Sequence, residues 1–294
     1  MNKYVVNDKS VINIELFETA NIMIFYKMNK IKSLIKYIVI LGVILFADAV
    51  IYEPYSLKIT SYDITNQQLS GLKIVFASDF HIAPYKWEKW RLQKIVSTIN
   101  EQNPDLVILG GDYVNRHSKT STLPPQKIIE AIQNIKAPKV AVLGNHDIYY
   151  GKNDVIEALT NASIPVLNNR NIKLNLQNKN VFIAGVSDYD TDKPDVKKAF
   201  EGIQSPAIFV THSPDVFDAL EENFDIAFAG HTHGGQIVLP FLGALAINTD
   251  SGRKYTYGRF DKNDKTMIVS SGLGSSVIPA RFNNLPEIVV VSIQ

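Results

Sequence analysis

Hydrophobic residues follow two patterns along this chain, one near the N-terminus and another over the rest of it. Residues 37–52, YIVILGVILFADAVIY, form a single apolar run that only Asp48 interrupts. After Glu53-Pro54, short β-rich apolar runs alternate with stretches that have helical spacing. This alternation is typical of an α/β domain.

The alternation predicts eight strands and five helices. The expected strands are residues 72–77, 106–109, 140–143, 181–184, 208–211, 226–229, 267–270 and 288–292. The expected helices are residues 88–100, 126–135, 154–161, 196–201 and 215–222. Because no repeat and no break in composition marks a further boundary, we expect one domain over residues 53–294.

The apolar run of residues 37–52 predicts a transmembrane anchor after a cytoplasmic segment, residues 1–36. The run is shorter than the roughly 20 residues that cross a bilayer, but Leu34 and Ile35 extend it if Lys36 snorkels. A cluster of lysines precedes it: Lys27, Lys30, Lys32 and Lys36. The positive-inside rule therefore places the residues after about 53 outside the cytoplasm.

Two alternatives stay open for this segment. Ala47-Asp48-Ala49 has the small-x-small form of a signal-peptide cleavage site, and a cleaved signal would give the same topology. A buried core helix is disfavoured, because lysines followed by unbroken apolar residues do not make an amphipathic helix. Met28, followed by NKIKSLIKY, is an alternative start of translation to Met1.

Polar clusters directly follow five of the expected strands. They are Ser78-Asp79-Phe80-His81, Gly110-Gly111-Asp112, Gly144-Asn145-His146-Asp147, His212-Ser213-Pro214 and Gly230-His231-Thr232-His233-Gly234-Gly235-Gln236. Because the ligand crevice of an open α/β sheet lies beyond the carboxyl ends of its strands, the clusters should converge on one edge. Five of the six histidines belong to these clusters, and only His117 does not.

Each cluster taken alone also has a structural explanation. Asp79 and Asp112 are typical cap or turn residues, and Gly-Asn-His-Asp suits a turn. The pair His231 and His233 beside glycines is better suited to a metal. Caps and turns do not explain five such clusters at strand ends, so together they indicate one metal-binding site.

The series D-x-H, G-D, G-N-H-D, H and G-H-x-H resembles the calcineurin-like metallophosphoesterase family, bacterial transmembrane or exported branch. The resemblance covers about residues 70–294, and all five motifs are present without substitution. It implies a four-layer sandwich, two mixed β-sheets flanked by helices, preceded by one N-terminal membrane helix. It also implies a metal-dependent phosphoric ester hydrolase with two divalent metal ions.

The family's motifs also imply a role for each matching residue. One metal ion would be held by Asp79, His81 and His233. The other would be held by Asn145, His212 and His231. Asp112 would bridge both ions, His146 would be the catalytic imidazole and Asp147 its partner. Nitrogen and oxygen ligands in a chain without cysteine suit Mn, Fe or Zn.

This residue set fits the hydrolysis of an anionic ester. Two divalent ions about 3.5–4 Å apart lower the pKa of a bridging water and clamp the phosphoryl oxygens. With two carboxylates and one hydroxide they leave a net charge of about +1, which attracts phosphate. Only a carboxylate offers the two oxygens of a bridging ligand, hence Asp112. After in-line attack by the hydroxide, a protonated His146 would donate to the leaving oxygen, with Asp147 orienting its ring.

Composition narrows the classes of function. The chain of 294 residues is 46% hydrophobic and 20% charged, which suffices for a folded core. A net charge of +1 does not create the strong positive field that attracts nucleic acid. The balanced composition also does not indicate the wide charged docking surface that a phosphoprotein phosphatase would use. A non-catalytic scaffold would be expected to have lost metal ligands, and none is missing.

The substrate we expect is a membrane lipid or another envelope phosphoester, since GHTHGGQ and GLGSSVIPARFNNLPEI after a membrane segment resemble the exported branch. A UDP-2,3-diacylglucosamine-type pyrophosphate of lipid A synthesis is the alternative, but it is made on the cytoplasmic face. We expect Arg281 to contact the substrate, because a Gly-rich turn directs it to the same edge and guanidinium grips phosphate at two points. The alternative is a surface arginine paired with Glu287 or an aspartate.

Overall fold

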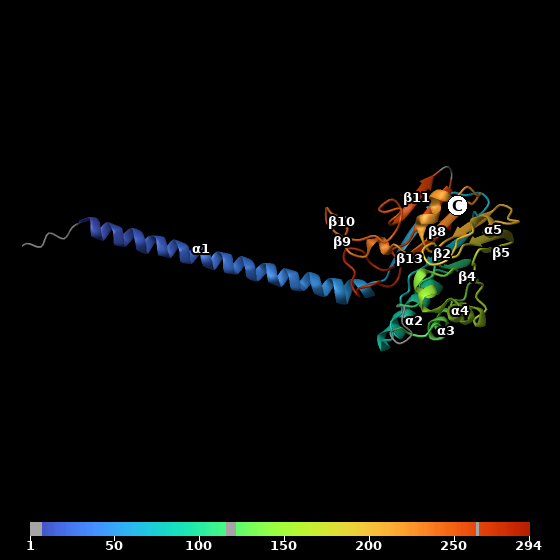
Figure 1. The fold of residues 1–294 in the computed structure, drawn as a ribbon, viewed down its shortest axis with the longest axis horizontal. Helices are drawn as coiled ribbons and strands as arrows, with labels where there is room; N and C mark the ends of the chain where they lie inside the picture. Colours follow the sequence, from blue (N-terminus) through green and yellow to red (C-terminus); the bar gives the residue numbers. More distant parts are fainter. Residues whose placement is uncertain (1–7, 116–121, 263–264) are drawn as a thin grey trace, which may run out of the picture. The chain divides into compact units, whose positions relative to one another are not determined.

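The structure is a computed structural model that describes residues 8–115, 122–262 and 265–294 (Figure 1). These residues form two compact units, Met1–Asp48 and Ala49–Gln294. The predicted domain limits at residues 36 and 52 stay a prediction. His117 lies outside the described residues.

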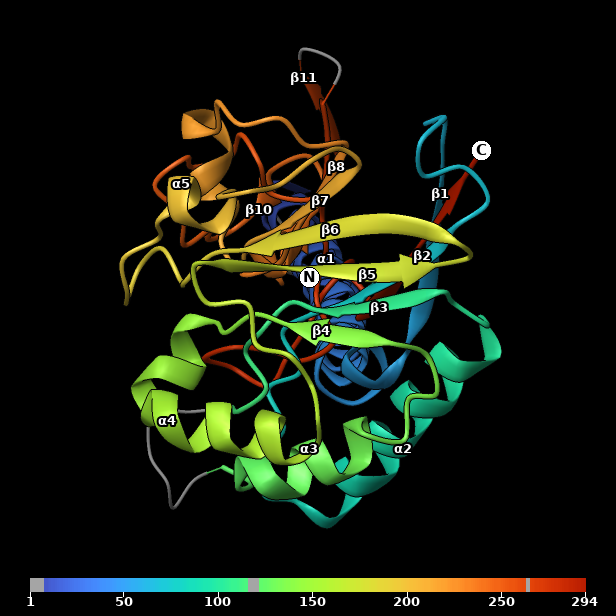
Figure 2. The same cartoon turned by 90° about the vertical axis from the view of Figure 1, so that its right-hand side faces the viewer.

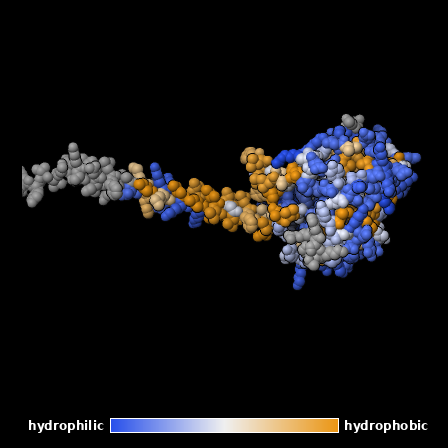
Figure 3. All heavy atoms as spheres, in the orientation of Figure 1, coloured by the Kyte–Doolittle hydropathy of each residue, from blue (hydrophilic) through white to orange (hydrophobic). Residues whose placement is uncertain are grey.

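The first unit contains one long helix, α1 (Asp8–Ala47). Met23–Tyr55, a segment of 33 residues with a mean hydropathy of 2.4, is long and apolar enough to cross a membrane. None of its most apolar stretch is buried in protein. Figure 3 shows that the hydrophobic part of this helix follows a part that carries hydrophilic side chains. The helix begins well before residue 37, in a segment where the sequence pattern predicted no element.

The second unit is built on two mixed sheets (Figure 2). The first sheet has the strand order β1-β13-β2-β3-β4. Its strands are β1 (Lys58–Ile64), β2 (Lys73–Ala77), β3 (Leu106–Leu109), β4 (Lys139–Ala141) and β13 (Glu287–Ile293). Strands β2, β3 and β4 are parallel, whereas β13 runs antiparallel to β2 and parallel to β1.

The second sheet has the strand order β11-β12-β8-β7-β6-β5. Its strands are β5 (Arg170–Leu176), β6 (Lys179–Gly185), β7 (Ala207–Val210), β8 (Ile226–Ala229), β11 (Gly258–Lys262) and β12 (Lys265–Val269). The four inner strands are parallel, and the two edge strands β5 and β11 are antiparallel to them. A short hairpin, β9 (Val238–Leu239) and β10 (Gly243–Ala244), lies outside both sheets.

The two sheets pack face to face through a core of side chains from both. Phe76 of β2 stacks on Phe228 of β8, with ring centroids 5.3 Å apart. Helices α2 (Lys86–Glu101), α3 (Pro125–Ile132) and α4 (Asn145–Asn161) cover the outer face of the first sheet. The short helix α5 (Val196–Ala199) and the 3₁₀ helix η3 (Pro214–Ala219) pack on the outer face of the second. The predicted four-layer sandwich is confirmed. Because both faces are covered, the inner strands are almost wholly apolar.

Candidate metal centre and active site

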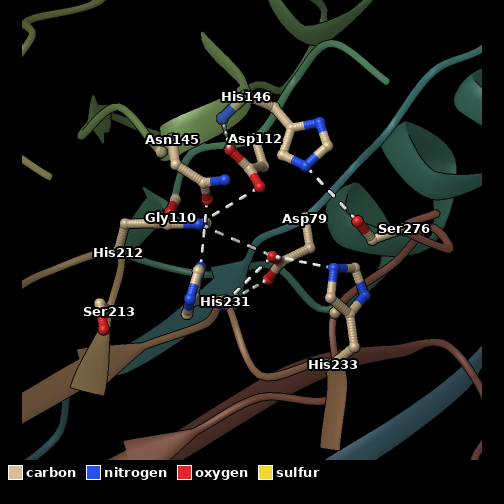
Figure 4. A network of polar contacts seen from close by, with 12 residues as sticks. Asp79, Gly110, Asp112, Asn145, His146, His212, Ser213, His231, His233 and Ser276 are labelled. Carbon is tan, nitrogen blue, oxygen red and sulfur yellow. Dashed lines mark hydrogen bonds and ion pairs between the residues drawn. The ribbon is translucent and has the colours of Figure 1, made fainter. Parts of the chain in front are cut away.

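The five polar clusters meet where strands of both sheets end (Figure 4). From the first sheet, Asp79 and His81 follow β2, Asp112 follows β3, and Asn145 and His146 begin α4 after β4. From the second sheet, His212 follows β7, while His231 and His233 follow β8. The structure therefore brings together side chains from segments about 150 residues apart, as the strand-end rule predicts.

The first group of possible metal ligands is Asp79, His81 and His233. The Nε2 atoms of His81 and His233 are 3.0 Å apart, and Asp79 Oδ1 is 3.5 Å from His233 Nε2. Burial lowers the pKa of both imidazoles to about 3. Two neutral rings that present the same nitrogen to one point, beside a carboxylate, are suited to a shared divalent cation.

A second group contains His212, His231 and Asn145. His231 Nδ1 lies 3.1 Å from Asn145 Oδ1, and His212 Nδ1 donates a hydrogen bond to the carbonyl of Gly110 at 2.7 Å. The Nε2 atom of His212 points to Asp112 Oδ2, 3.3 Å away. Burial lowers the pKa of His212, but Asp112 more than reverses this and raises it well above its usual value. The local field thus favours positive charge at this point.

Asp112 lies between the two groups. Its Oδ2 atom is 3.4 Å from His81 Nε2 and 3.3 Å from His212 Nε2, and its Oδ1 atom accepts a hydrogen bond from the backbone N–H of His146. Burial raises the pKa of Asp112, but the neighbouring His212 and His81 outweigh burial and hold it well below the usual value. One oxygen of an ionised carboxylate thus contacts a histidine of each group.

The backbone at the site is strained. Five non-glycine residues adopt the left-handed backbone conformation, with φ angles of 42° to 69°: Asp79, His81, Asp112, His231 and His233. Each such residue costs on the order of 1 kcal/mol, which the surrounding packing must offset. The turns point the side chains of successive strand ends at one place.

Glycines allow the clusters to approach each other this closely. A Cβ atom at Gly144 would lie 2.2 Å from Asp112 Oδ1. A Cβ atom at Gly230 would lie 2.2 Å from Ser78 Oγ and 2.4 Å from Asp79 Oδ2. These glycines of the G-N-H-D and G-H-x-H motifs therefore make room for the carboxylates.

His146 stands at the edge of this cluster. Its Nδ1 atom is 2.9 Å from the carbonyl oxygen of Asn115, and its Nε2 atom is 3.4 Å from Ser276 Oγ (Figure 4). Its ring also meets the ring of His81 edge to face, with centroids 4.6 Å apart. Because a carbonyl can only accept, Nδ1 carries a proton in this arrangement.

Asp147 is a fully buried connector of the backbone. One carboxylate oxygen accepts hydrogen bonds from the N–H groups of Asp112 (2.8 Å) and Gly144 (3.0 Å), and the other accepts from those of Tyr113 (2.9 Å) and Val114 (3.4 Å). Burial, and then the charge of Asp112, raise the pKa of Asp147 to about 7. These contacts connect the loop after β3 to the start of α4. That Asp147 orients the ring of His146 stays a prediction.

The sequence interpretation missed Asp190. Its Oδ2 atom is 3.2 Å from Nε2 of His231, which also lies 2.7 Å from the carbonyl oxygen of Asn248. These acceptors leave Nδ1 of His231 directed at Asn145. A signal was present, because Ser187-Asp188-Tyr189-Asp190 is a sixth polar cluster that follows a predicted strand.

Arg281 is fully buried, so it is not the surface arginine of the alternative interpretation. Its guanidinium donates to the carbonyls of Ser271 (2.7 Å), Gly274 and Asn284 (3.1 Å). One of its nitrogens is 3.5 Å from His233 Nδ1. Arg281 thus holds the turn after β12, and it would reach a substrate only if that turn moved. The substrate contact stays a prediction.

Comparison with known proteins identifies the family. Residues 72–235 match calcineurin-like phosphoesterase. An uncharacterised metallophosphoesterase, YkuE of Bacillus subtilis (strain 168), is 30% identical over 253 residues, which cover 82% of this chain and 87% of that protein. Phosphodiesterase YaeI of Escherichia coli (strain K12) is 29% identical, covering 75% and 82%. A transmembrane protein with a metallophosphoesterase domain from Danio rerio is 31% identical, covering 76% and 53%.

The chain belongs to the calcineurin-like phosphoesterase family, because the match covers more than half of it. It is a metal-dependent phosphoric ester hydrolase. The family and the clustered His and Asp side chains together indicate a dinuclear metal site.

Proposed function

We propose that this enzyme is a two-metal phosphodiesterase that acts on a membrane lipid or another phosphoester of the cell envelope, outside the cytoplasm. One observation carries the chemistry. The carboxylate of Asp112 lies within 3.4 Å of His81 and of His212, so it can serve both groups of ligands. A single-metal site would need no carboxylate between two groups.

The side chains divide between two ions as follows. Asp79, His81 and His233 would hold one ion, Asn145, His212 and His231 the other, and Asp112 both. When bound, two divalent ions neutralise an anionic ester and supply a deprotonated water as nucleophile. The donor set fits them, because it combines carboxylates with imidazoles and contains no sulfur.

His146 would manage the proton of the leaving group. The Asn115 carbonyl at Nδ1 fixes the ring, which directs Nε2 at the hydroxyl of Ser276. A proton held at Nε2 can pass to the departing alkoxide oxygen, and Ser276 beside it can orient that transfer. Asp190 would keep His231 turned so that Nδ1 remains available as a ligand.

A panel of esters, tested on the full chain in detergent after removal of metal and reloading with Mn²⁺ or Zn²⁺, would test this function. It should contain a p-nitrophenyl diester, a p-nitrophenyl monoester, a phospholipid and a pyrophosphate-linked nucleotide lipid. We expect both the aryl diester and the phospholipid to be hydrolysed. Removal of the metal ions with a chelator should abolish both activities. Exclusive turnover of the monoester would indicate a phosphatase instead. Two bound metals without turnover of any ester would indicate a scaffold.

The location has a separate test. An alkaline phosphatase fused to the C-terminus should be active, because the lysines before the apolar run favour the cytoplasmic side. If the alkaline phosphatase fusion is inactive and a C-terminal fusion to green fluorescent protein is fluorescent, the catalytic domain lies in the cytoplasm. That result would favour the cytoplasmic pyrophosphate lipid as substrate.

A further inference from the structure

A cavity leads from the candidate metal centre to the surface of the catalytic unit. It has a volume of about 240 Å³, and His81 and Asn115 line it on the side of the site. The buried ion pair of Glu88 and Arg91 also lines it. The other lining residues are mostly apolar and include Pro54, Tyr55, Tyr85, Val277, Ile278 and Pro279. A substrate with a polar head and an apolar body would find matching surfaces along this cavity.

Three exposed apolar side chains line the cavity, and three more belong to the same segments or to a hairpin bonded to them. We call these six the apolar rim: Tyr85, Trp87, Phe241, Leu242, Val277 and Ile278. All six expose half or more of their surface, and Val277 exposes 88% of it. Tyr85 stacks on Trp87, and the loop of Ile278 is bonded to the segment before the β9–β10 hairpin through Gln236. The rim is therefore one assembled feature from three segments.

The backbone conformation holds two of these residues in solvent. Phe241, at the tip of the hairpin, has a φ of 66°, and Val277 has a φ of 63°. A left-handed conformation is costly for aromatic and especially for β-branched residues. Backbone strain that exposes apolar side chains does not stabilise the folded monomer, so it indicates a function for the exposed surface.

Chain connectivity indicates the partner. The candidate membrane span ends at Tyr55, and its last residues belong to the catalytic unit. The carbonyl of Ala49 accepts a hydrogen bond from Arg281 N–H (2.9 Å), and the carboxylate of Glu53 accepts from Asn283 N–H (2.7 Å). The loop that carries Val277 and Ile278 is thus fastened to the end of the span. The chain therefore continues directly from the span into the segment that is bonded to the loop of the apolar rim.

The composition of the rim also suits a bilayer rather than a protein partner. Tyr and Trp prefer the interface between lipid headgroups and acyl chains. Three exposed lysines accompany them on α2, namely Lys86, Lys89 and Lys94. Glu88, the acidic residue among them, is buried and paired with Arg91 at 2.8 Å. Exposed charge on this part of α2 is therefore positive and complements anionic lipid.

We propose that the apolar rim inserts into the interfacial layer of the bilayer that anchors the chain, and that the cavity admits lipid headgroups directly from that layer. This inference rests on the proposed membrane-anchored phosphoesterase and names how its substrate is delivered. Figure 3 shows hydrophobic atoms on the side of the catalytic unit where Figure 1 labels β9 and β10.

Tryptophan fluorescence tests the position of the rim without depending on metal or turnover. The chain has two tryptophans, Trp87 in the rim and Trp90 one helical turn further along α2. The full chain would be reconstituted in vesicles that contain phosphatidylglycerol and brominated phosphatidylcholine. We expect bromine to quench at least half of the fluorescence, more strongly from shallow than from deep positions on the acyl chain. Unquenched tryptophans would overturn the proposal and indicate an aqueous or protein-covered rim.

The absence of cysteine from the chain provides a matched control. Phe241→Cys in the rim and Asn175→Cys on β5, on the opposite side of the catalytic unit in Figure 1, would each carry the same environment-sensitive dye. The dye at position 241 should shift to shorter wavelength and be quenched by doxyl lipid, and the dye at position 175 should not. Equal responses at both positions would contradict a specific rim.

Kinetics test whether insertion matters for substrate delivery. Phe241→Asp combined with Leu242→Asp changes only the hairpin tip, which does not line the cavity. We expect turnover of phospholipid in vesicles to fall at least tenfold, while kcat/KM for a soluble aryl diester stays unchanged. An equal fall on both substrates, or no fall on either, would overturn the delivery role. Failure of the proposed function alone would leave the quenching intact and abolish turnover of every ester.

Discussion

His81 Nε2 lies 3.0 Å from His233 Nε2, although 152 residues separate them in the sequence. One imidazole follows a strand of the first sheet and the other follows a strand of the second. Two buried, neutral imidazoles this close can share either a single proton or a single cation. Any ion bound between them would therefore join the two sheets of the sandwich, and metal removal would loosen more than the site itself.

Replacing Asp112 with alanine should remove both metal ions, because this carboxylate touches both groups of ligands. Elemental analysis of the purified variant should find less than about a tenth of the metal of the parent protein, as expected when a charged bridging ligand is lost. Asp218→Ala is the matched control, since Asp218 is an exposed partner of Lys254. One metal retained at full occupancy would show that the bridge is elsewhere.

Replacing His146 with alanine should keep the metals but lower kcat by about 10²–10⁴-fold, the usual contribution of a general acid. The loss should be greatest for alkyl esters, whose leaving groups need a proton, and smallest for p-nitrophenyl esters. The measurement is kcat over a series of leaving groups. The same factor for all of them would favour electrostatic stabilisation over proton donation.

Replacing Asp190 with alanine should weaken binding of one metal ion by about 10–100-fold, the usual effect of losing a carboxylate that orients a ligating histidine. Titration against a fluorescent chelator would measure this affinity. Asp192→Ala is the control in the same loop, because Asp192 pairs with Lys152. Equal affinities in the two variants would mean that Asp190 has no part in holding His231.

Replacing Asp147 with alanine should destabilise the fold, because four buried N–H groups lose their acceptor. At about 1 kcal/mol each, the loss of roughly 4 kcal/mol lowers Tm by about 8–16 °C. Calorimetry would compare it with Glu157→Ala, an exposed change in the same helix. Loss of kcat at unchanged Tm would instead support the catalytic partnership with His146.

The raised pKa of Asp147 adds a dependence on pH in the metal-free protein. Its folded pKa is about 7, against an unfolded value of about 3.9, so between these values the unfolded state binds fewer protons. The contribution of this residue to stability therefore falls as pH rises from about 4 to about 7. The difference in Tm between parent and Asp147→Ala should narrow over that range, and a difference that widens would contradict the shift.

Replacing Arg281 with lysine separates its two possible roles. A lysine lacks the planar fork that reaches the carbonyls of Ser271, Gly274 and Asn284 together, so the turn after β12 should lose roughly 3 kcal/mol and Tm should fall by several degrees. Arg259→Lys, a change at an exposed ion pair, is the control. A tenfold lower kcat/KM at unchanged Tm would instead restore the predicted contact with the substrate.

Much of the fold followed from apolar patterning, because buried parallel strands such as Leu106–Leu109 are apolar without interruption. Edge strands escaped the prediction for the opposite reason: β1 (KITSYDI) and β5 (RNIKLNL) are half exposed and rich in polar residues. Helix α4 consists of two helical segments that meet at Gly151, which has a non-helical φ of 149°. The predicted helix of residues 154–161 matches the second segment, whereas the first carries the polar motif and has no apolar periodicity.

Site chemistry followed from the motifs, but the hydrogen-bond partners did not. Asn115 and Ser276 reach His146 through loops whose paths no periodicity encodes. Arg281 was expected at the surface of the site, because a single charged residue after a turn carries no signal of burial. Its carbonyl partners become apparent only in three dimensions.

The position of β13 limits when the enzyme can become active. This strand lies between β1 and β2, with Glu287 opposite Lys58, so the first sheet stays open until the last residues of this sequence have been made. Strand β2, after which Asp79 and His81 lie, has no neighbour on that side before then. A chain that lacks β13 therefore cannot assemble the complete first sheet, and the strand that precedes Asp79 and His81 would be left without one of its two neighbours.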